Sequence, residues 1–192
     1  MGMPQLPRLW NAAAVRALPD DGKRYELVDG ELLVTPSPTG VHQRTIMALI
    51  RRLDPYLRSV DVGELLVSPA DLSLGADEVL QPDLFVIPPA PTRAPPRWSE
   101  IRSLLLAIEV LSPGTARYDR LLKRRRYQRA GVPEYWIVDP DGRVVERWRP
   151  EDQRPDVVSE MLEWRPDPAI EPLVIELAGL FAEVWGEGES KY

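Results

Sequence analysis

The feature that most constrains this chain is the continuous apolar run SLLLAIEVL at 103–111, which contains one charged residue, Glu109. Such a run is typical of a central strand whose sheet is covered on both faces. An ionised carboxylate beside a buried strand is costly unless a positive group compensates it. Two explanations of Glu109 stay open at this point: a structural pair with an arginine, or a ligand of a metal ion.

The remaining strand and helix signals place this run inside one mixed sheet. Asp29-Gly30 and Asp141-Gly142 are hairpin turn signals. Strands are expected within 24–36, 62–74, 78–88, 133–140, 143–150, 157–164 and 172–176, and helices within 37–59, 112–131 and 177–185. An antiparallel N-terminal meander followed by strand–helix–strand predicts the α/β (α+β) class, with a mixed sheet flanked by helices. We expect a single domain over 1–192, with peripheral strands and a short helix in 151–192.

Composition narrows the possible chemistry. The chain has no cysteine and one histidine, His42, so disulfides, thiolate metal sites and multi-histidine zinc sites are excluded. A metal here must be held mainly by carboxylates, which favours Mg²⁺ or Mn²⁺. With a net charge of −6, any contact with nucleic acid needs a local basic patch. No membrane span and no secretion signal are evident, so we expect a cytoplasmic protein.

A second acid and a lysine form a candidate site with Glu109. Asp83 precedes four apolar residues in QPDLFVI, and on an adjacent strand it could share one ion with Glu109. Asp119, Lys123 and Tyr127 are spaced i, i+4 and i+8, so they share one face of the predicted helix. A lysine there could activate the attacking water or offset charge on a phosphate, although a solvated pair with Asp119 is the structural alternative. Tyr127 could equally be a core residue.

The same helix carries the most basic stretch of the chain, and we name Arg120 and Arg124 as candidate contacts to a phosphate backbone. A solvated helix face is the alternative explanation. The arginines of the stretch are Arg117, Arg120, Arg124, Arg125, Arg126 and Arg129.

Five segments resemble a known family: RYELVDGELLVTPSP…HQ, QPDLFVI, AIEVLSPGT, YDRLLK and GVPEYWIVDP. In this order and spacing they are similar to the Uma-type family of predicted endonucleases, in the PD-(D/E)XK or restriction-endonuclease-like superfamily. The resemblance covers about residues 24–150. It implies a fold of that class and hydrolysis of phosphodiesters with Mg²⁺ or Mn²⁺.

Carried over by residue, the resemblance makes Pro82-Asp83 the "PD" pair and Glu109 the second acid, both metal ligands. Glu26 resembles the additional N-terminal acid. The simple pattern places lysine at position 111, where this chain has leucine, so Lys123 would be the migrated catalytic lysine. His42 and Gln81 are candidate substrate contacts through their places in the family segments.

Three functional hypotheses follow. The first is a metal-dependent endonuclease acting on DNA, expected as a homodimer by analogy with enzymes that cut two strands. The second is a catalytically inert nucleic-acid-binding module on the same fold, which Leu111 and the net charge keep open. The third is an oligomerisation protein whose arginine-rich helix binds an acidic partner.

Overall fold

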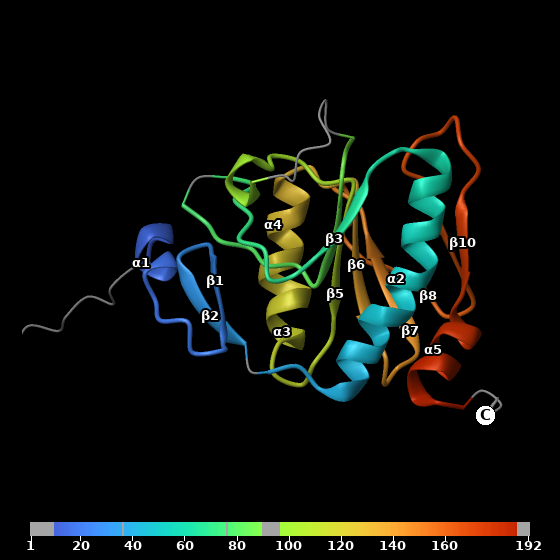
Figure 1. The fold of residues 1–192 in the computed structure, drawn as a ribbon, viewed down its shortest axis with the longest axis horizontal. Helices are drawn as coiled ribbons and strands as arrows, with labels where there is room; N and C mark the ends of the chain where they lie inside the picture. Colours follow the sequence, from blue (N-terminus) through green and yellow to red (C-terminus); the bar gives the residue numbers. More distant parts are fainter. Residues whose placement is uncertain (1–9, 36, 76, 90–96, 188–192) are drawn as a thin grey trace, which may run out of the picture.

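The computed structural model describes residues 10–35, 37–75, 77–89 and 97–187, and a six-stranded mixed sheet forms its centre (Figure 1). The strand order is β3-β4-β5-β6-β7-β8. β5 and β6 are parallel, whereas the other neighbours in this sheet are antiparallel. The strands are β3 (Glu64–Val67), β4 (Leu84–Ile87), β5 (Leu106–Val110), β6 (Glu134–Asp139), β7 (Val144–Trp148) and β8 (Asp156–Val158). The predicted α/β class with a mixed sheet is confirmed.

All five residues of β5 are buried, so the strand lies in the interior of the protein. Successive side chains of a strand point to opposite faces of the sheet. Leu106, Ile108 and Val110 therefore belong to one hydrophobic core. Ala107 belongs to the core on the opposite face, and Glu109 points to that side. The strand alternation thus decides which face carries the acid.

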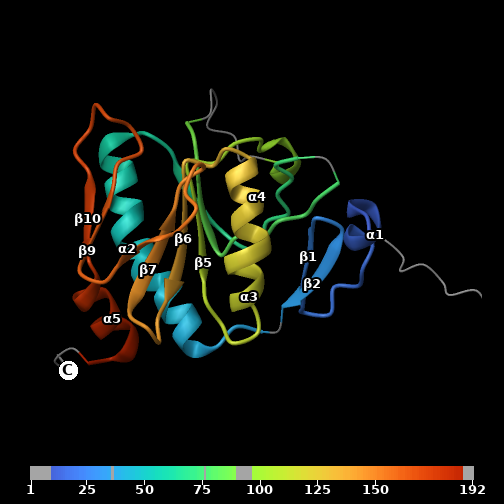
Figure 2. The same ribbon diagram turned by 180° about the vertical axis from the view of Figure 1, so that it is seen from behind.

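The face opposite Glu109 is covered by α2 (Gly40–Val60), α5 (Leu177–Trp185) and the separate hairpin of β9 (Met161–Trp164) and β10 (Leu173–Glu176) (Figures 1 and 2). α2 buries Leu49, Leu53 and Leu57 at the helical spacing seen in the sequence. Trp136 of β6 and Phe181 of α5 are buried in the same core. None of the helices among the described residues is both long and apolar enough to cross a lipid bilayer.

The face that carries Glu109 is covered by a helix with an irregular middle (Figure 2). The helix consists of α3 (Ala116–Tyr118), a π-helical turn η2 (Asp119–Lys123) and α4 (Arg124–Arg129). The sequence predicted this helix but not its wider turn. Gly131, with a φ of 69°, follows the end of the helix, where a glycine readily adopts the left-handed conformation of a C-terminal cap.

Beside this helix lies the hairpin of β1 (Arg24–Val28) and β2 (Glu31–Thr35), with α1 (Ala12–Arg16) on the far side of the hairpin (Figure 1). The hairpin is the one that Asp29-Gly30 predicted, and both turn residues have positive φ. It forms its own two-stranded sheet, and a single bridge between Leu27 and Val79 pairs its backbone with the loop before β4.

Two predicted strands are shorter in the structure. Within 78–88, Val79 and Leu80 form only isolated bridges and β4 begins at Leu84. Pro82 has no backbone N–H to donate, so the ladder is interrupted there. Within 62–74, a strand forms at Glu64–Val67 and a single bridge at Leu72. The interruption leaves Asp83 immediately before β4, where its side chain can line a site. A short 3₁₀ turn, η1 (Trp98–Glu100), completes the described elements.

The position of β5 predicts the effect of truncating it. Ile108 is fully buried, so Ile108→Ala should lower the free energy of unfolding by about 2–5 kcal/mol through lost apolar contacts and a residual cavity. Val157→Ala is the control, because Val157 is 57% exposed and should change stability little. Urea denaturation followed by circular dichroism measures both. Equal losses in the two variants would contradict the assigned burial.

Candidate active site

The two acids of the predicted site face each other across neighbouring strands. Leu84 of β4 is opposite Ile108 of β5 in an antiparallel register. One step further along, this register sets Asp83 opposite Glu109, on the face of the sheet that the α3–α4 helix covers. Both acids line a cleft of ≈ 800 Å³ that also includes Lys123. The structure thus brings Asp83 and Glu109 to one cleft, and their sharing of one ion stays a prediction.

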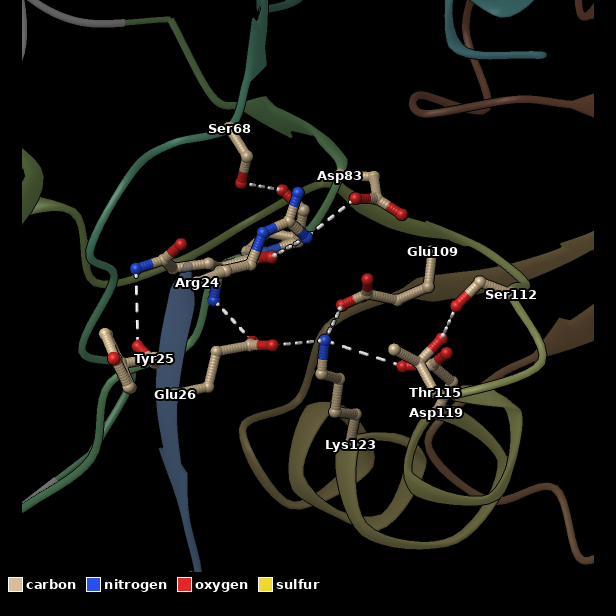
Figure 3. A network of polar contacts seen from close by, with 12 residues as sticks. Arg24, Tyr25, Glu26, Ser68, Asp83, Glu109, Ser112, Thr115, Asp119 and Lys123 are labelled. Atoms are coloured by element: carbon tan, nitrogen blue, oxygen red, sulfur yellow. Dashed lines mark hydrogen bonds and ion pairs between the residues drawn. The ribbon is translucent and has the colours of Figure 1, made fainter. Parts of the chain in front are cut away.

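Lys123 contacts acids from three elements (Figure 3). Its Nζ donates to Glu109 Oε1 at 3.0 Å and lies 2.8 Å from Glu26 Oε2 and 3.5 Å from Asp119 Oδ1. The lysine is only 2% exposed, so these contacts are shielded from water. The alternative of a solvated lysine paired with Asp119 alone is therefore wrong.

The π-helical turn is where the helix faces the acids. It spans Asp119–Lys123, and both of its terminal residues are buried. π-turns inside α-helices are rare and occur frequently at functional sites. One turn further along, Tyr127 donates its hydroxyl to Glu109 Oε1 at 3.3 Å, and its ring packs on Tyr135 with centroids 4.7 Å apart. Tyr127 is thus both a core residue and a neighbour of the site.

Burial and neighbouring charges shift the titration of this cluster. Burial, together with the negative charges of Asp83 and Asp119, raises the pKa of Glu109 well above its ordinary value, although Lys123 opposes the shift. Burial also raises the pKa of Asp119. For Lys123, burial acts against the charged form, but the charges of Glu109 and Glu26 outweigh it and raise its pKa well above 10.5. The lysine is therefore a permanent cation.

Asp83 has a different set of partners. Its Oδ1 accepts from Arg24 at 2.7 Å, and its Oδ2 lies 3.0 Å from His42 Nε2 and accepts from the Val110 backbone N–H at 2.9 Å. Burial would raise its pKa, but the hydrogen bond with His42 and the charge of Arg24 lower it far below 3.8. Asp83 is therefore ionised in the folded chain. The cleft thus has one carboxylate kept ionised and a second, Glu109, with a raised pKa.

Three further predicted residues lie close to Asp83 and Lys123: Glu26, His42 and Gln81. The backbone N–H of Gln81 donates to Glu26 Oε1 at 2.8 Å, and its side-chain amide donates to Asp71 at 2.7 Å. His42 sits in the first turn of α2, where Thr39 accepts from its backbone N–H. His42 and Gln81 line the cleft, whereas Glu26 is fully buried behind it. Their roles with a substrate stay predictions.

Three of the six arginines in the arginine-rich stretch, Arg120, Arg126 and Arg129, pair with acids of the same chain. Arg120 pairs with Glu146 and Asp139, at 2.7 and 3.4 Å. Arg124 lies 4.6 Å from the centre of the Trp148 ring. Neither Arg120 nor Arg124 lines the cleft. Their contact with a phosphate backbone therefore stays a prediction, and it would have to occur outside the cleft.

Two residues of the site were not among the sequence-predicted set, Arg24 and Asp119. Arg24 and Glu26 are two apart on β1, so strand alternation places them on the same face, and this signal could have found Arg24. Asp119 was seen only as a helix neighbour of Lys123. Its burial depends on the fold around it.

The donor set suits a hard divalent cation. Within the described part of the chain, the hydrogen bonds and ion pairs of Glu109 all use Oε1, which leaves Oε2 available. Asp83 and the Val110 carbonyl are oxygen donors of the kind that Mg²⁺ and Mn²⁺ prefer, with water completing the shell. Among the described residues, no group of three His, Asp or Glu side chains is arranged to hold a metal ion. The protein would thus supply two carboxylates rather than a complete cage.

The mixed sheet, with Glu109 on its central strand beside the buried Lys123 and Asp83 just before the neighbouring strand, agrees with the restriction-endonuclease-like fold that the sequence resemblance implied. The comparison with family models places the chain more closely. Residues 12–178 match the Uma2 model, described as "Putative restriction endonuclease". The chain therefore belongs to the Uma2 family, and the match extends beyond the 24–150 expected from the sequence.

A solved structure from Anabaena variabilis ATCC 29413, described as "a putative nuclease belonging to DUF820", has the same fold. The two chains are 18% identical, with a TM-score of 0.74 over 91% of this chain and 99% of the other. A search of curated proteins finds no match.

Removing the ammonium of Lys123 should lower the free energy of unfolding more than removing the charge of one acid that contacts it. Lys123→Met leaves three buried carboxylates without a counter-charge, so we expect a loss of about 3–5 kcal/mol in unfolding free energy. Glu109→Gln leaves one cation for two acids and should be neutral or stabilising at pH 7. Urea denaturation measures both. Arg58→Met, which breaks an exposed pair with Asp54, is the control and should have little effect. A larger loss in Glu109→Gln than in Lys123→Met would contradict the shared-cation arrangement.

The raised pKa of Glu109 predicts a sign for the pH dependence. A folded-state pKa above the unfolded value of 4.5 means that the folded chain binds the extra proton. Its contribution to stability is therefore lost as pH rises through that window. Glu109→Gln lacks this loss, so its stability relative to wild type should increase as the pH rises from about 4 toward neutrality. Thermal denaturation across this range measures the difference. A difference that shrinks with rising pH would mean that Lys123 lowers the pKa of Glu109 instead.

Proposed function

We propose that this protein is a metal-dependent endonuclease that hydrolyses phosphodiester bonds of DNA in the cleft between Asp83 and Glu109. The observation that carries the proposal is the meeting of Asp83, Glu109 and Lys123 in one cleft, where Lys123 lies 3.0 Å from Glu109. Membership of a family described as restriction endonucleases supports the reaction class.

In this proposal, Asp83, Glu109 and the Val110 carbonyl hold Mg²⁺ or Mn²⁺. When bound, such an ion lowers the pKa of a water molecule and polarises the phosphoryl oxygens. The chain's own part is to fix the ligands. Tyr127 and Lys123 hold Glu109 Oε1, and the Val110 N–H and His42 hold Asp83 Oδ2.

Lys123 acts through its charge in this proposal. A general base must release its proton near neutral pH. The raised pKa of Lys123 keeps the ammonium charged, so it cannot take a proton from water. It can instead orient the nucleophile or stabilise the negative charge that develops on the phosphate. Glu26 holds the lysine from the opposite side, which makes it a positioning residue here.

An inert nucleic-acid-binding module is the second candidate. One observation favours it: both oxygens of Asp83 are already engaged, by Arg24 on one side and by His42 and the Val110 N–H on the other. A chain of this kind would bind nucleic acid in a salt-dependent way without turnover.

A homodimer, a cytoplasmic location and a single-domain organisation belong to the same proposal. The dimer rests on analogy with enzymes that cut two strands with two sites. DNA is preferred over RNA on the resemblance to restriction-type enzymes.

The two candidates differ in turnover. Plasmid and single-stranded DNA should be cleaved by the purified protein with Mn²⁺ or Mg²⁺ but not with EDTA. Asp83→Asn, Glu109→Gln and Lys123→Gln should each lower the rate at least about hundredfold, because each removes a charge that acts in the cleft. Glu163→Gln, on an exposed position of β9, is the matched control and should keep wild-type activity. Folded protein that cleaves no substrate in any metal, yet binds DNA, would favour the inert module.

A further inference from the structure

Arg24 occupies an unusual place in this site. It begins β1, and its side chain is only 22% exposed. Its guanidinium donates to Asp83 Oδ1 at 2.7 Å and to the Gln81 carbonyl at 3.3 Å (Figure 3). The charges of both Asp83 and Glu109 act on it. The guanidinium therefore already provides positive charge to the pair of acids that the proposed function assigns to a divalent cation.

The charges of the cleft fall into two groups. Lys123 contacts Glu26, Glu109 and Asp119, and it does not bond to Asp83. Among the described residues, the side chains that form ion pairs or hydrogen bonds with the Asp83 carboxylate are Arg24 and His42. Arg24 is thus the permanent cation that neutralises Asp83 directly.

A divalent cation and the guanidinium are poorly compatible on one carboxylate. Like charges a few ångströms apart in a buried site repel strongly. The carboxylate has enough lone pairs for several partners, so geometry alone does not force a choice. The repulsion between the two cations forces the choice, because Asp83 is almost completely buried and water screens the charges near it little.

We propose that Arg24 is a built-in competitor for the divalent cation: it neutralises Asp83 in the metal-free chain and leaves Asp83 when Mg²⁺ or Mn²⁺ binds. The inference rests on the proposed metal-dependent function. The long side chain and its partial exposure to the cleft allow this movement without unfolding of β1. Apparent metal affinity is then reduced by the fraction of molecules in which Arg24 leaves Asp83 free.

Removing Arg24 should therefore tighten metal binding. We expect Arg24→Gln and Arg24→Met to bind Mn²⁺ about tenfold or more tightly than wild type, which corresponds to Asp83 being covered in roughly nine of ten metal-free molecules. Isothermal titration calorimetry with Mn²⁺ alone, on full-length protein stripped of metal and without DNA, gives the dissociation constants. Melting temperatures in EDTA verify that each variant is folded. If one of the two Arg24 variants does not fold, the other still gives the measurement.

Two controls make the result specific. Lys23→Gln removes one positive charge from the same cleft wall, but Lys23 pairs with Asp21 at 2.8 Å, so affinity should change less than about twofold. Asp83→Asn should abolish the tight binding.

Three results would overturn the inference. The first is Mn²⁺ binding in folded Arg24→Gln and Arg24→Met that is no tighter than in wild type. The second is an equal gain in Lys23→Gln. The third is undiminished binding in Asp83→Asn. The first two results leave the proposed nuclease open to its own cleavage test, whereas the third would also remove Asp83 from the proposed metal site. Absence of Mn²⁺ binding in wild type and all variants would instead remove the metal-dependent function, and the competition with it.

Discussion

The ammonium of Lys123 is the contact on which the rest of this site depends. It joins Glu26 of the N-terminal hairpin, Glu109 of the central strand and Asp119 of the π-helical turn. The hairpin forms a sheet of its own and pairs with the main chain of the protein through one bridge. The buried cluster therefore fixes the hairpin against the sheet as well as holding Glu109. A single cation thus links the architecture and the proposed chemistry.

Such a cluster is a poor way to gain stability. Three buried acids share one lysine, and desolvation of each charge opposes burial. Replacing the cluster with apolar side chains would often be neutral or stabilising in a protein interior. Accumulation of charge at one place inside an otherwise apolar fold is instead the pattern found at sites where function sets the residues. The π-turn is a second local departure from regular structure, and it lies at the charge cluster, because it begins at Asp119 and ends at Lys123.

Much of the fold could be predicted from the sequence because its elements carry strong local signals. The apolar run around Ile108 gave β5, Asp29-Gly30 gave the hairpin, and the helical spacing of Leu49 and Leu53 gave α2. The signals failed where the outcome depends on tertiary contacts. The π-turn has no sequence signature of its own, and the end of the ladder before Leu84 depends on how Pro82 meets its neighbours.

The same division applies to the site. Asp83 and Glu109 could be found because acids beside buried strands are rare. Lys123 could be found because its spacing from Asp119 places both on one helix face. The family resemblance then supplied the roles of all three. Arg24 could not be singled out by type, since the chain has many arginines, and three of the six on the α3–α4 helix likewise pair with acids. Its position on the same strand face as Glu26 was the one available signal. Pairing with Asp83 required the three-dimensional arrangement.

The two permanent cations that pair with Asp83 and Glu109, Arg24 and Lys123, differ in a way that suits different tasks. Lys123 is a compact charge, 2% exposed and held in place by three acids. Arg24 has a longer side chain, is partly exposed, and has one acid as its partner. A fixed charge beside Glu109 can orient a reacting group, because it is in place before the substrate arrives. A movable charge beside Asp83 can be exchanged for another cation, and its release leaves a guanidinium in the cleft whose planar donors match a phosphate. The two acids therefore differ because their cations differ: Glu109 keeps its partner Lys123, whereas Asp83 can exchange Arg24 for another cation.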